Sequence, residues 1–167
     1  MRNTFCCAAF LIVGTLPYNI AGAAPSAEIL EFGYYEVLKE GSRYADQNAT
    51  SGVIQTGATV KLLQQTNIIP IEPGRLFGFR FRLKGFGDKE DIEIREVVTH
   101  PRMTPPELKA STGFETRLSL VMKQGEFSDY AGYSFTHDYE MVEGEWRFEF
   151  WYADKKLLEQ KFKTVKR

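Results

Sequence analysis

The sequence predicts an all-β fold, an antiparallel β-sandwich of about eight strands. Aromatic residues make up 14% of the 167 residues, and aromatic side chains favour strands. Glycine and proline recur at short intervals, as they do in chains with many tight turns. No apolar stretch at helical spacing is long enough to predict a helix between strands. Strands that follow one another in this way pack as two antiparallel sheets, each with one buried face.

The first part of the chain predicts two strands separated by a long loop. Residues 28–38 (EILEFGYYEVL) form the first strand and residues 58–66 form the second. Residues 43–57, between them, are rich in Asn, Asp, Ser, Thr and Gly, which is the composition of a loop. We expect no regular structure in that loop beyond a short edge strand at 53–55.

The clearest strand signal lies at residues 75–84. Phenylalanines at 77, 79 and 81 alternate there with Gly78, Arg80 and Arg82. This is the pattern of a strand with one buried face and one exposed face. We therefore expect both arginines to point to solvent. The turn at residues 85–91 (GFGDKED) then leads into a further strand at 92–99.

The remaining part of the chain predicts four more strands after a proline-rich loop. The loop is residues 100–106 (HPRMTPP), and its prolines exclude it from the interior of a sheet. The four strands follow at 114–123, 130–141, 145–152 and 156–165, of which the last two form a hairpin. With the strands before the loop they make eight, and they predict an immunoglobulin-like sandwich.

The final hairpin carries the most informative alternation. Trp146, Phe148 and Phe150 share one parity, so a strand here aims them all at the core. The opposite parity, which faces solvent, holds Arg147 and then Trp151. A tryptophan in a position otherwise reserved for charge is a candidate for binding.

An outward tryptophan can stack on a sugar ring, an aromatic ligand or a partner protein. We therefore predict Trp151 and Arg147 as binding residues, and Arg80 and Arg82 as their companions if the two strands are neighbours. A structural role for Trp151 stays open. The loop 43–57 could cover it, or a β-bulge could reverse the alternation and turn it inward.

Residues 1–23 have the organisation of a secretory signal peptide. Arg2 precedes an apolar run of 12 residues, 5–16, and the small residues 21–23 follow. A run of 12 is too short to span a bilayer, which needs about 20 residues. We expect a periplasmic or secreted protein with no membrane span, whose residues 24–167 form one domain.

Loss of the signal peptide would also remove both cysteines and Arg2, which takes the formal charge from −1 to −2. A chain without thiols has no disulfides, so its stability must come from a packed core. A negative charge argues against a nucleic-acid partner, because such a partner requires a basic surface.

The sequence contains no motif for catalysis, a metal or a cofactor. Ser134, in GYSFT, lacks the second glycine of a nucleophile elbow and lies in a predicted strand. His100 and His137 are the two histidines, and neither has a partner at metal-ligand spacing. We expect His100 to lie in the proline-rich loop and His137 at the margin of the core. We therefore predict no catalytic residue, no metal ligand and no cofactor.

Several segments together carry a family resemblance. They are EFGYYE at 31–36, IIPIEPGRLFGFRFRLKG at 68–85, the proline loop after Val97 and Val98, and GEWRFEFWY followed by KKLLEQKF. In these the chain resembles a bacterial domain-of-unknown-function family, number three-eight-five-nine, over nearly all of its mature length. The resemblance implies a secreted or periplasmic all-β domain. It supplies no substrate, cofactor or active-site residue.

We therefore expect a non-enzymatic binding or protein-interaction module, whose partner is an unknown protein or a small-molecule or glycan ligand. A flat apolar patch around Trp151 would favour it. The first alternative is a hydrolase or lyase, favoured by a cleft that holds His100 or His137 beside two carboxylates with shifted pKa. The second is a chaperone-like structural subunit, favoured by a regular edge strand without proline or charge.

Overall fold

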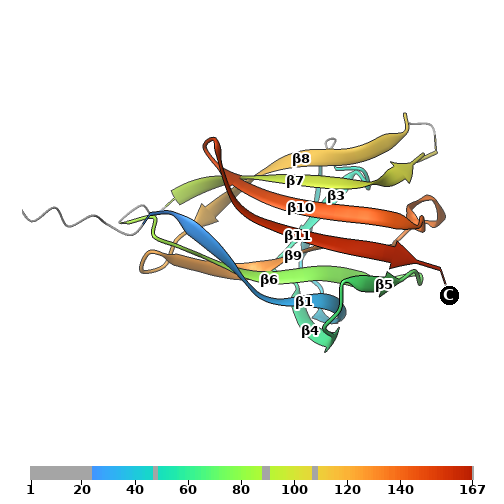
Figure 1. The fold of residues 1–167 in the computed structure, drawn as a ribbon, viewed down its shortest axis with the longest axis horizontal. Helices are drawn as coiled ribbons and strands as arrows, with labels where there is room; N and C mark the ends of the chain where they lie inside the picture. Colours follow the sequence, from blue (N-terminus) through green and yellow to red (C-terminus); the bar gives the residue numbers. More distant parts are fainter. Residues whose placement is uncertain (1–23, 47–48, 88–90, 107–108, 167) are drawn as a thin grey trace, which may run out of the picture.

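The computed structural model describes residues 24–46, 49–87, 91–106 and 109–166, so the predicted signal peptide, 1–23, lies outside the described residues. Two sheets form the two layers of a sandwich (Figure 1). The four-stranded sheet has the order β4 (Thr59–Gln64), β1 (Ser26–Lys39), β6 (Leu76–Lys84), β9 (Glu126–Ser134). The five-stranded sheet has the order β5 (Ile68–Pro70), β11 (Lys155–Val165), β10 (Gly144–Tyr152), β7 (Asp91–Met103), β8 (Ser111–Val121).

A separate hairpin pairs β2 (Ser42–Ala45) with β3 (Val53–Thr56), and a 3-10 turn, η1, spans Asp138–Glu140. Every pairing between these strands is antiparallel except β5 with β11, which is parallel. The predicted all-β sandwich is confirmed. Eight of the strands correspond to the eight predicted segments, and the remaining three, β2, β3 and β5, have three or four residues each. Across the residues that the structure describes, no helix is long and apolar enough to span a membrane.

The core is formed where the aromatic faces of β6 and β10 meet. Phe77 packs on Trp146, with ring centroids 5.1 Å apart and a T-shaped geometry. Further along the same strands, Phe81 packs on Phe150 with centroids 4.8 Å apart. T-shaped pairs place the positive edge of one ring on the negative face of the other, so they stabilise the core beyond the burial of area. The alternation in both sequences therefore predicts the buried face correctly.

The prediction that residues 100–106 form a loop is wrong for its first half, because β7 continues to Met103. The reason is the register of β7 with β8, which is irregular between Thr99 and Met103. Pairing of β7 with β10 also ends at Thr99. Pro101 therefore lies where no ladder hydrogen bond is required of it, which is how a strand tolerates proline. His100 is consequently buried, with 3% of its surface exposed.

The strand predicted at 130–141 is also partly wrong. β9 begins earlier, at Glu126, and ends at Ser134. The chain then turns around the carboxylate of Glu140, which is fully buried. That carboxylate accepts hydrogen bonds from the Tyr133 hydroxyl at 2.8 Å and from the backbone N–H groups of Thr136 and His137 at 2.6 and 2.8 Å. His137 is exposed and stacks on Tyr139, so it does not lie at the core margin as expected.

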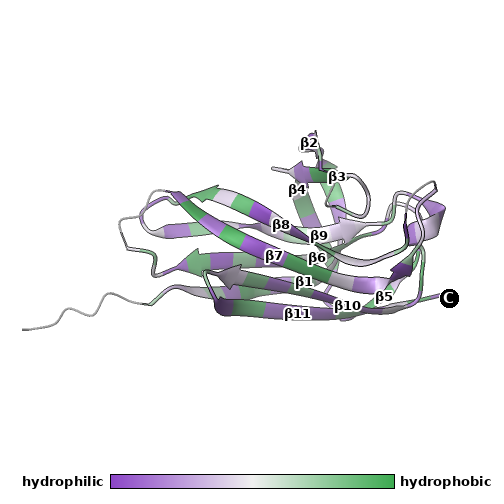
Figure 2. Cartoon of the chain, turned by 90° about the horizontal axis from the view of Figure 1, so that it is seen from above, coloured by the Kyte–Doolittle hydropathy of each residue, from purple (hydrophilic) through white to green (hydrophobic). Residues whose placement is uncertain are grey.

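The segment predicted as a long loop, 43–57, contains the hairpin of β2 and β3. Figure 2 shows this hairpin on one side of the sandwich. The residues between its strands contact β7 and β8: Thr50 Oγ1 lies 2.8 Å from His100 Nε2, and Thr116 Oγ1 donates to Asp46 Oδ2 at 3.3 Å. The expected short strand at 53–55 is confirmed as part of β3.

Candidate functional site

Trp151 lies on the outer face of the five-stranded sheet, as its parity predicts. Its indole N–H donates to Glu149 Oε2 at 3.2 Å, and Glu149 also lies on the outer face. A bulge does occur beside it, because β10 and β11 shift register between Phe150 and Trp151. The extra residue is Leu157 on β11, so the alternation along β10 itself is kept.

Two cations flank the Trp151 ring. Arg95 is its cross-strand neighbour on β7, with Cζ 5.0 Å from the ring centroid. Lys156 is its neighbour on β11, with Nζ 5.7 Å from the centroid. Because β7 and β11 lie on opposite sides of β10, the indole stands between the two charges, and its residual exposure is partial. Cation–π contacts of this kind stabilise a fixed ring orientation.

Lys156 also links two acidic side chains. Its Nζ lies 3.1 Å from Glu149 Oε1 and 2.6 Å from Glu159 Oε2. The hydrogen bond from Lys156, and then that from Lys161, lower the pKa of Glu159 to about 2. The same acids raise the pKa of Lys156, Glu159 more than Glu149. The surface around Trp151 is therefore a charged network and not the flat apolar patch that would have favoured an interaction module.

Arg80 and Arg82 lie on the outer face of the other sheet. Their strand, β6, pairs with β1 and β9, whereas β10 pairs with β7 and β11. Arg80 Nε lies 2.8 Å from Glu31 Oε1, and Arg82 Nη1 lies 3.3 Å from Glu28 Oε1. The structure therefore does not bring these arginines together with Trp151 and Arg147.

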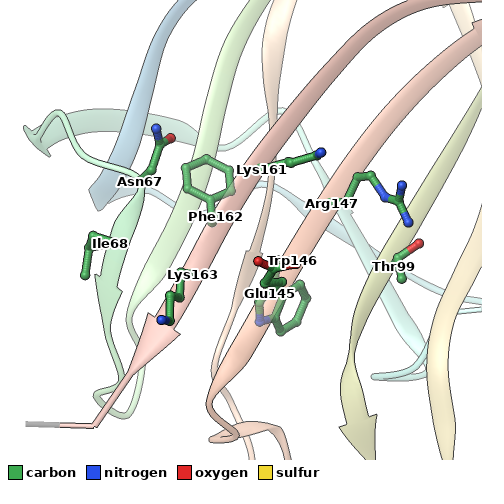
Figure 3. Close-up of a pocket in the computed structure, with 9 residues that line it drawn as sticks. All are labelled: Asn67, Ile68, Thr99, Glu145, Trp146, Arg147, Lys161, Phe162 and Lys163. Atoms are coloured by element: carbon green, nitrogen blue, oxygen red, sulfur yellow. The ribbon is translucent and has the colours of Figure 1, made fainter.

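A groove of about 330 Å³ lies on the outer face of the five-stranded sheet, at the end of β10 away from Trp151. Residues from four strands and the residue before β5 line it: Asn67, Ile68, Thr99, Glu145, Trp146, Arg147, Lys161, Phe162 and Lys163. Figure 3 shows Arg147 and Lys161 at one level on neighbouring strands, with Glu145 and Lys163 one step further along. Of the predicted binding residues, Arg147 alone belongs to this groove.

The charges in the groove differ from those on the rest of β10 and β11. Outside the groove, the outward acids and lysines of both strands form ion pairs. Lys161, at its rim, pairs with Glu159 at 3.1 Å. Within the described part of the chain, Glu145, Arg147 and Lys163 have no ion-pair or hydrogen-bond partner for their side chains. Arg147 also stands directly opposite Lys161 in the register, and like charges in such a pair destabilise a sheet.

The comparisons with known proteins agree with the fold. The model of the family described as Domain of unknown function (DUF3859) matches residues 23–164. The chain belongs to this family. The crystal structure of an immunoglobulin-like protein from Pseudomonas aeruginosa is similar to this DUF3859 chain, with a TM-score of 0.61 and 26% sequence identity. That comparison covers 87% of this chain and 99% of the other. No curated protein matches the sequence.

These findings confirm the family resemblance and the immunoglobulin-like fold, and they bring no activity with them. Neither histidine of the DUF3859 chain lines the groove described above. His100 donates from Nδ1 to the Pro101 carbonyl and accepts at Nε2 from Thr50 Oγ1, both at 2.8 Å. Burial lowers its pKa, which favours the neutral ring. In the described residues no group of three acids, histidines or cysteines could hold a metal ion.

The edges of the two main sheets also lack the signature of strand addition. In the part of the DUF3859 chain that the structure describes, each edge carries a charge or a proline: Lys61 on β4, Asp129 on β9, Arg117 on β8, Pro70 on β5, and Lys161 on the part of β11 that β5 leaves open. Asp129 in addition accepts from the backbone N–H of Tyr130 at 2.8 Å. Charged and self-satisfied edges oppose pairing with another chain.

Sequence reasoning missed most of the groove. Lys161 and Lys163 share the outward parity of β11, so the hairpin alone could have placed them near Arg147. Asn67 and Thr99 come from other parts of the chain, and no sequence signal connects them to the hairpin. Only the order of the strands in the sheet does so.

Proposed function

We propose that this protein is a non-enzymatic binding module that takes its ligand on the outer face of the five-stranded sheet. The observation that supports this proposal is the groove, with three charged side chains that have no partner among the residues that the structure describes. On the same strands the other outward charges form ion pairs. The charges in the groove are therefore available to a ligand.

A bound anion would remove the charge repulsion between Arg147 and Lys161. Arg147 and Lys161 face each other across β10 and β11, and an anion between them turns a repulsion into two attractions. The guanidinium can hold a carboxylate or phosphate through two parallel hydrogen bonds. The sheet beneath is rigid, because its aromatic side chains are packed in the core, so little order has to be gained on binding.

Trp151 and its network form the far end of this proposed binding face. Trp151 is four residues from Arg147 on the same strand and the same face, which corresponds to roughly 13 Å. Because Arg95 and Lys156 flank the ring, we assign Trp151 a contact through its exposed edge and not through a ring face. Arg80 and Arg82 are outside the proposed surface, since their sheet faces the other way and each forms an ion pair.

We further propose that the protein works in the periplasm or outside the cell. The organisation of residues 1–23, with a basic start, an apolar run and small residues at the end, supports export. Fractionation of cells that express either the full chain or a form without residues 1–23 tests this. The full chain should reach the periplasm or medium, and the shortened form should stay inside. Equal distribution of both would refute export through this segment.

Recovery of ligands by purified protein tests the binding function. Immobilised wild type and variants Arg147→Ala and Trp151→Ala are exposed to periplasmic extract and to a glycan array. Arg82→Ala is the matched control, because it removes an arginine from the opposite face. We expect the wild type and Arg82→Ala to retain the same components and Arg147→Ala to lose them. If all four proteins retain the same components, the outer face is not the binding surface.

A further inference from the structure

We infer that the groove on β10 and β11 selects a saccharide of uronic acids, in which each ring carries one carboxylate among neutral hydroxyl groups. This inference rests on the proposed binding function and names its ligand class. The groove holds both of the chemical features that such a ligand requires: cations for a carboxylate, and neutral or acidic oxygen and nitrogen groups for hydroxyls.

The carboxylate receptor is Arg147, with Lys161 beside it. The Arg147 guanidinium has no acid partner in the described chain, so it can donate two parallel hydrogen bonds to a ligand carboxylate. Lys161 shares its charge with Glu159, 3.1 Å away, and adds a second, weaker attraction. Lys163, one step along β11, lies opposite Glu145 in the sheet register of β10 with β11. The net excess of positive charge therefore lies at Arg147.

The hydroxyl receptors lie around that cation. Glu145 offers carboxylate oxygens that accept from hydroxyl groups, and Thr99 offers a hydroxyl of its own. The Asn67 side-chain oxygen already accepts from Gln160 Nε2 at 2.8 Å, which leaves the Asn67 amide N–H groups to donate.

The size of the groove also fits a saccharide. Ligand pockets that hold small molecules have volumes of about 300 Å³ and above, and this one has about 330 Å³. One or two sugar rings fill such a space. A longer oligosaccharide that continues along β10 would reach the edge of Trp151, which supports the assignment of that residue to the same face.

An extended peptide fits the groove less well. Peptides gain affinity on sheets by adding a strand at an edge. β10 is paired on both sides from Arg147 to Trp151, and β11 from Lys163 to Val165. The groove lies on the face of these strands, and the open edge of β11, residues 155–162, carries charges that oppose strand addition. The nearest edge strand, β5, has three residues and ends in Pro70, which has no N–H to donate. A peptide would therefore bind by side chains alone.

Titration calorimetry with trigalacturonate, a linear trisaccharide of uronic acids, tests the inference. Maltotriose is the neutral control, and inorganic phosphate is the control for a simple anion. We expect trigalacturonate to bind and both controls to bind at least about tenfold more weakly. Arg147→Ala should weaken trigalacturonate binding by at least about tenfold, because a bidentate charged contact is lost.

Arg117→Ala is the matched variant. Arg117 is exposed on the same face of the same sheet but pairs with Glu93 at 2.6 Å, so its loss removes an equal charge away from the groove. We expect less than about a twofold change for this variant. Circular dichroism and thermal unfolding of both variants must match the wild type, so that a loss of binding is not a loss of fold.

Three results would overturn the inference: no binding of trigalacturonate, equal binding of phosphate, or equal weakening by Arg117→Ala and Arg147→Ala. The proposed function fails separately. If trigalacturonate does not bind but Arg147→Ala still loses components from the extract or the array, the binding face stands and the ligand class is wrong. If Arg147→Ala alters neither the recovery of components nor the calorimetric titration, both proposals are wrong.

Discussion

Replacing Glu96 by glutamine should make the protein more stable at alkaline pH. Glu96 has the inward parity of Ile94 and Val98 on β7, and its cross-strand neighbours are Phe150 and Thr116. Burial raises the pKa of its carboxyl from 4.5 to about 7. The folded protein therefore prefers the neutral acid at this position, and glutamine is a neutral group of the same shape.

The sign and the size follow from linkage. A carboxyl whose folded pKa is raised ionises in the unfolded chain first, so the free energy of unfolding falls as pH rises from 4.5 to about 7 and then levels off. The shift from 4.5 to about 7 corresponds to about 3 kcal/mol. Because the Glu96 residue is only half-buried, about 3 kcal/mol is an upper bound for the loss.

Urea denaturation of wild type and Glu96→Gln at about pH 5 and about pH 8 measures the effect. His100 acts in the opposite direction, because burial lowers its pKa and its protonation destabilises the fold below the unfolded value of 6.5. The difference between wild type and variant cancels that contribution. We expect the variant to gain up to about 2.5 kcal/mol over wild type between the two pH values, because part of the loss has already occurred at about pH 5. If the free energy of unfolding changes by the same amount between the two pH values in both proteins, the reasoning is wrong.

Three further substitutions test the fold. Glu140→Ala should lower the free energy of unfolding by about 3 to 5 kcal/mol in urea denaturation, because it leaves the buried Tyr133 hydroxyl and two backbone N–H groups without their acceptor; a loss below about 1 kcal/mol would contradict this. Gly78→Ala should lower the midpoint of thermal unfolding, because its Cβ would lie 2.1 Å from the Ala131 carbonyl oxygen, and an unchanged midpoint would contradict that contact. Phe148→Ala should cost about 3 to 5 kcal/mol, since Phe148 is fully buried; an exposed position would cost less than about 1 kcal/mol.

The long strands could be predicted from the sequence because their side chains alternate over eight residues or more. β6 and β10 are the clearest cases, and their aromatic faces meet as parity predicts. β5 could not be found in this way. It has three residues, and its parallel pairing with β11 is a tertiary contact. The rule that proline is excluded from the interior of a sheet failed at Pro101. The register of β7 with β8 is irregular there, so the strand needs no backbone N–H at this position.

The candidate site was predicted in part, for a related reason. Parity indicates which way Arg147, Trp151, Arg80 and Arg82 point, and the structure places all four on outer faces. Parity does not indicate which sheet a strand joins. That is why the companions proposed for Trp151 lie on the opposite layer, and why the lysines and Asn67 of the groove were missed.

The central claim is that the groove beside Arg147 is a ligand site, and backbone amide chemical shifts in a titration with trigalacturonate test it most directly. The account predicts that the amides of Thr99, Arg147, Lys161 and Lys163 shift together and saturate, while those of β6 on the opposite sheet stay fixed. Shifts confined to β6, or none at a ligand excess, would contradict it.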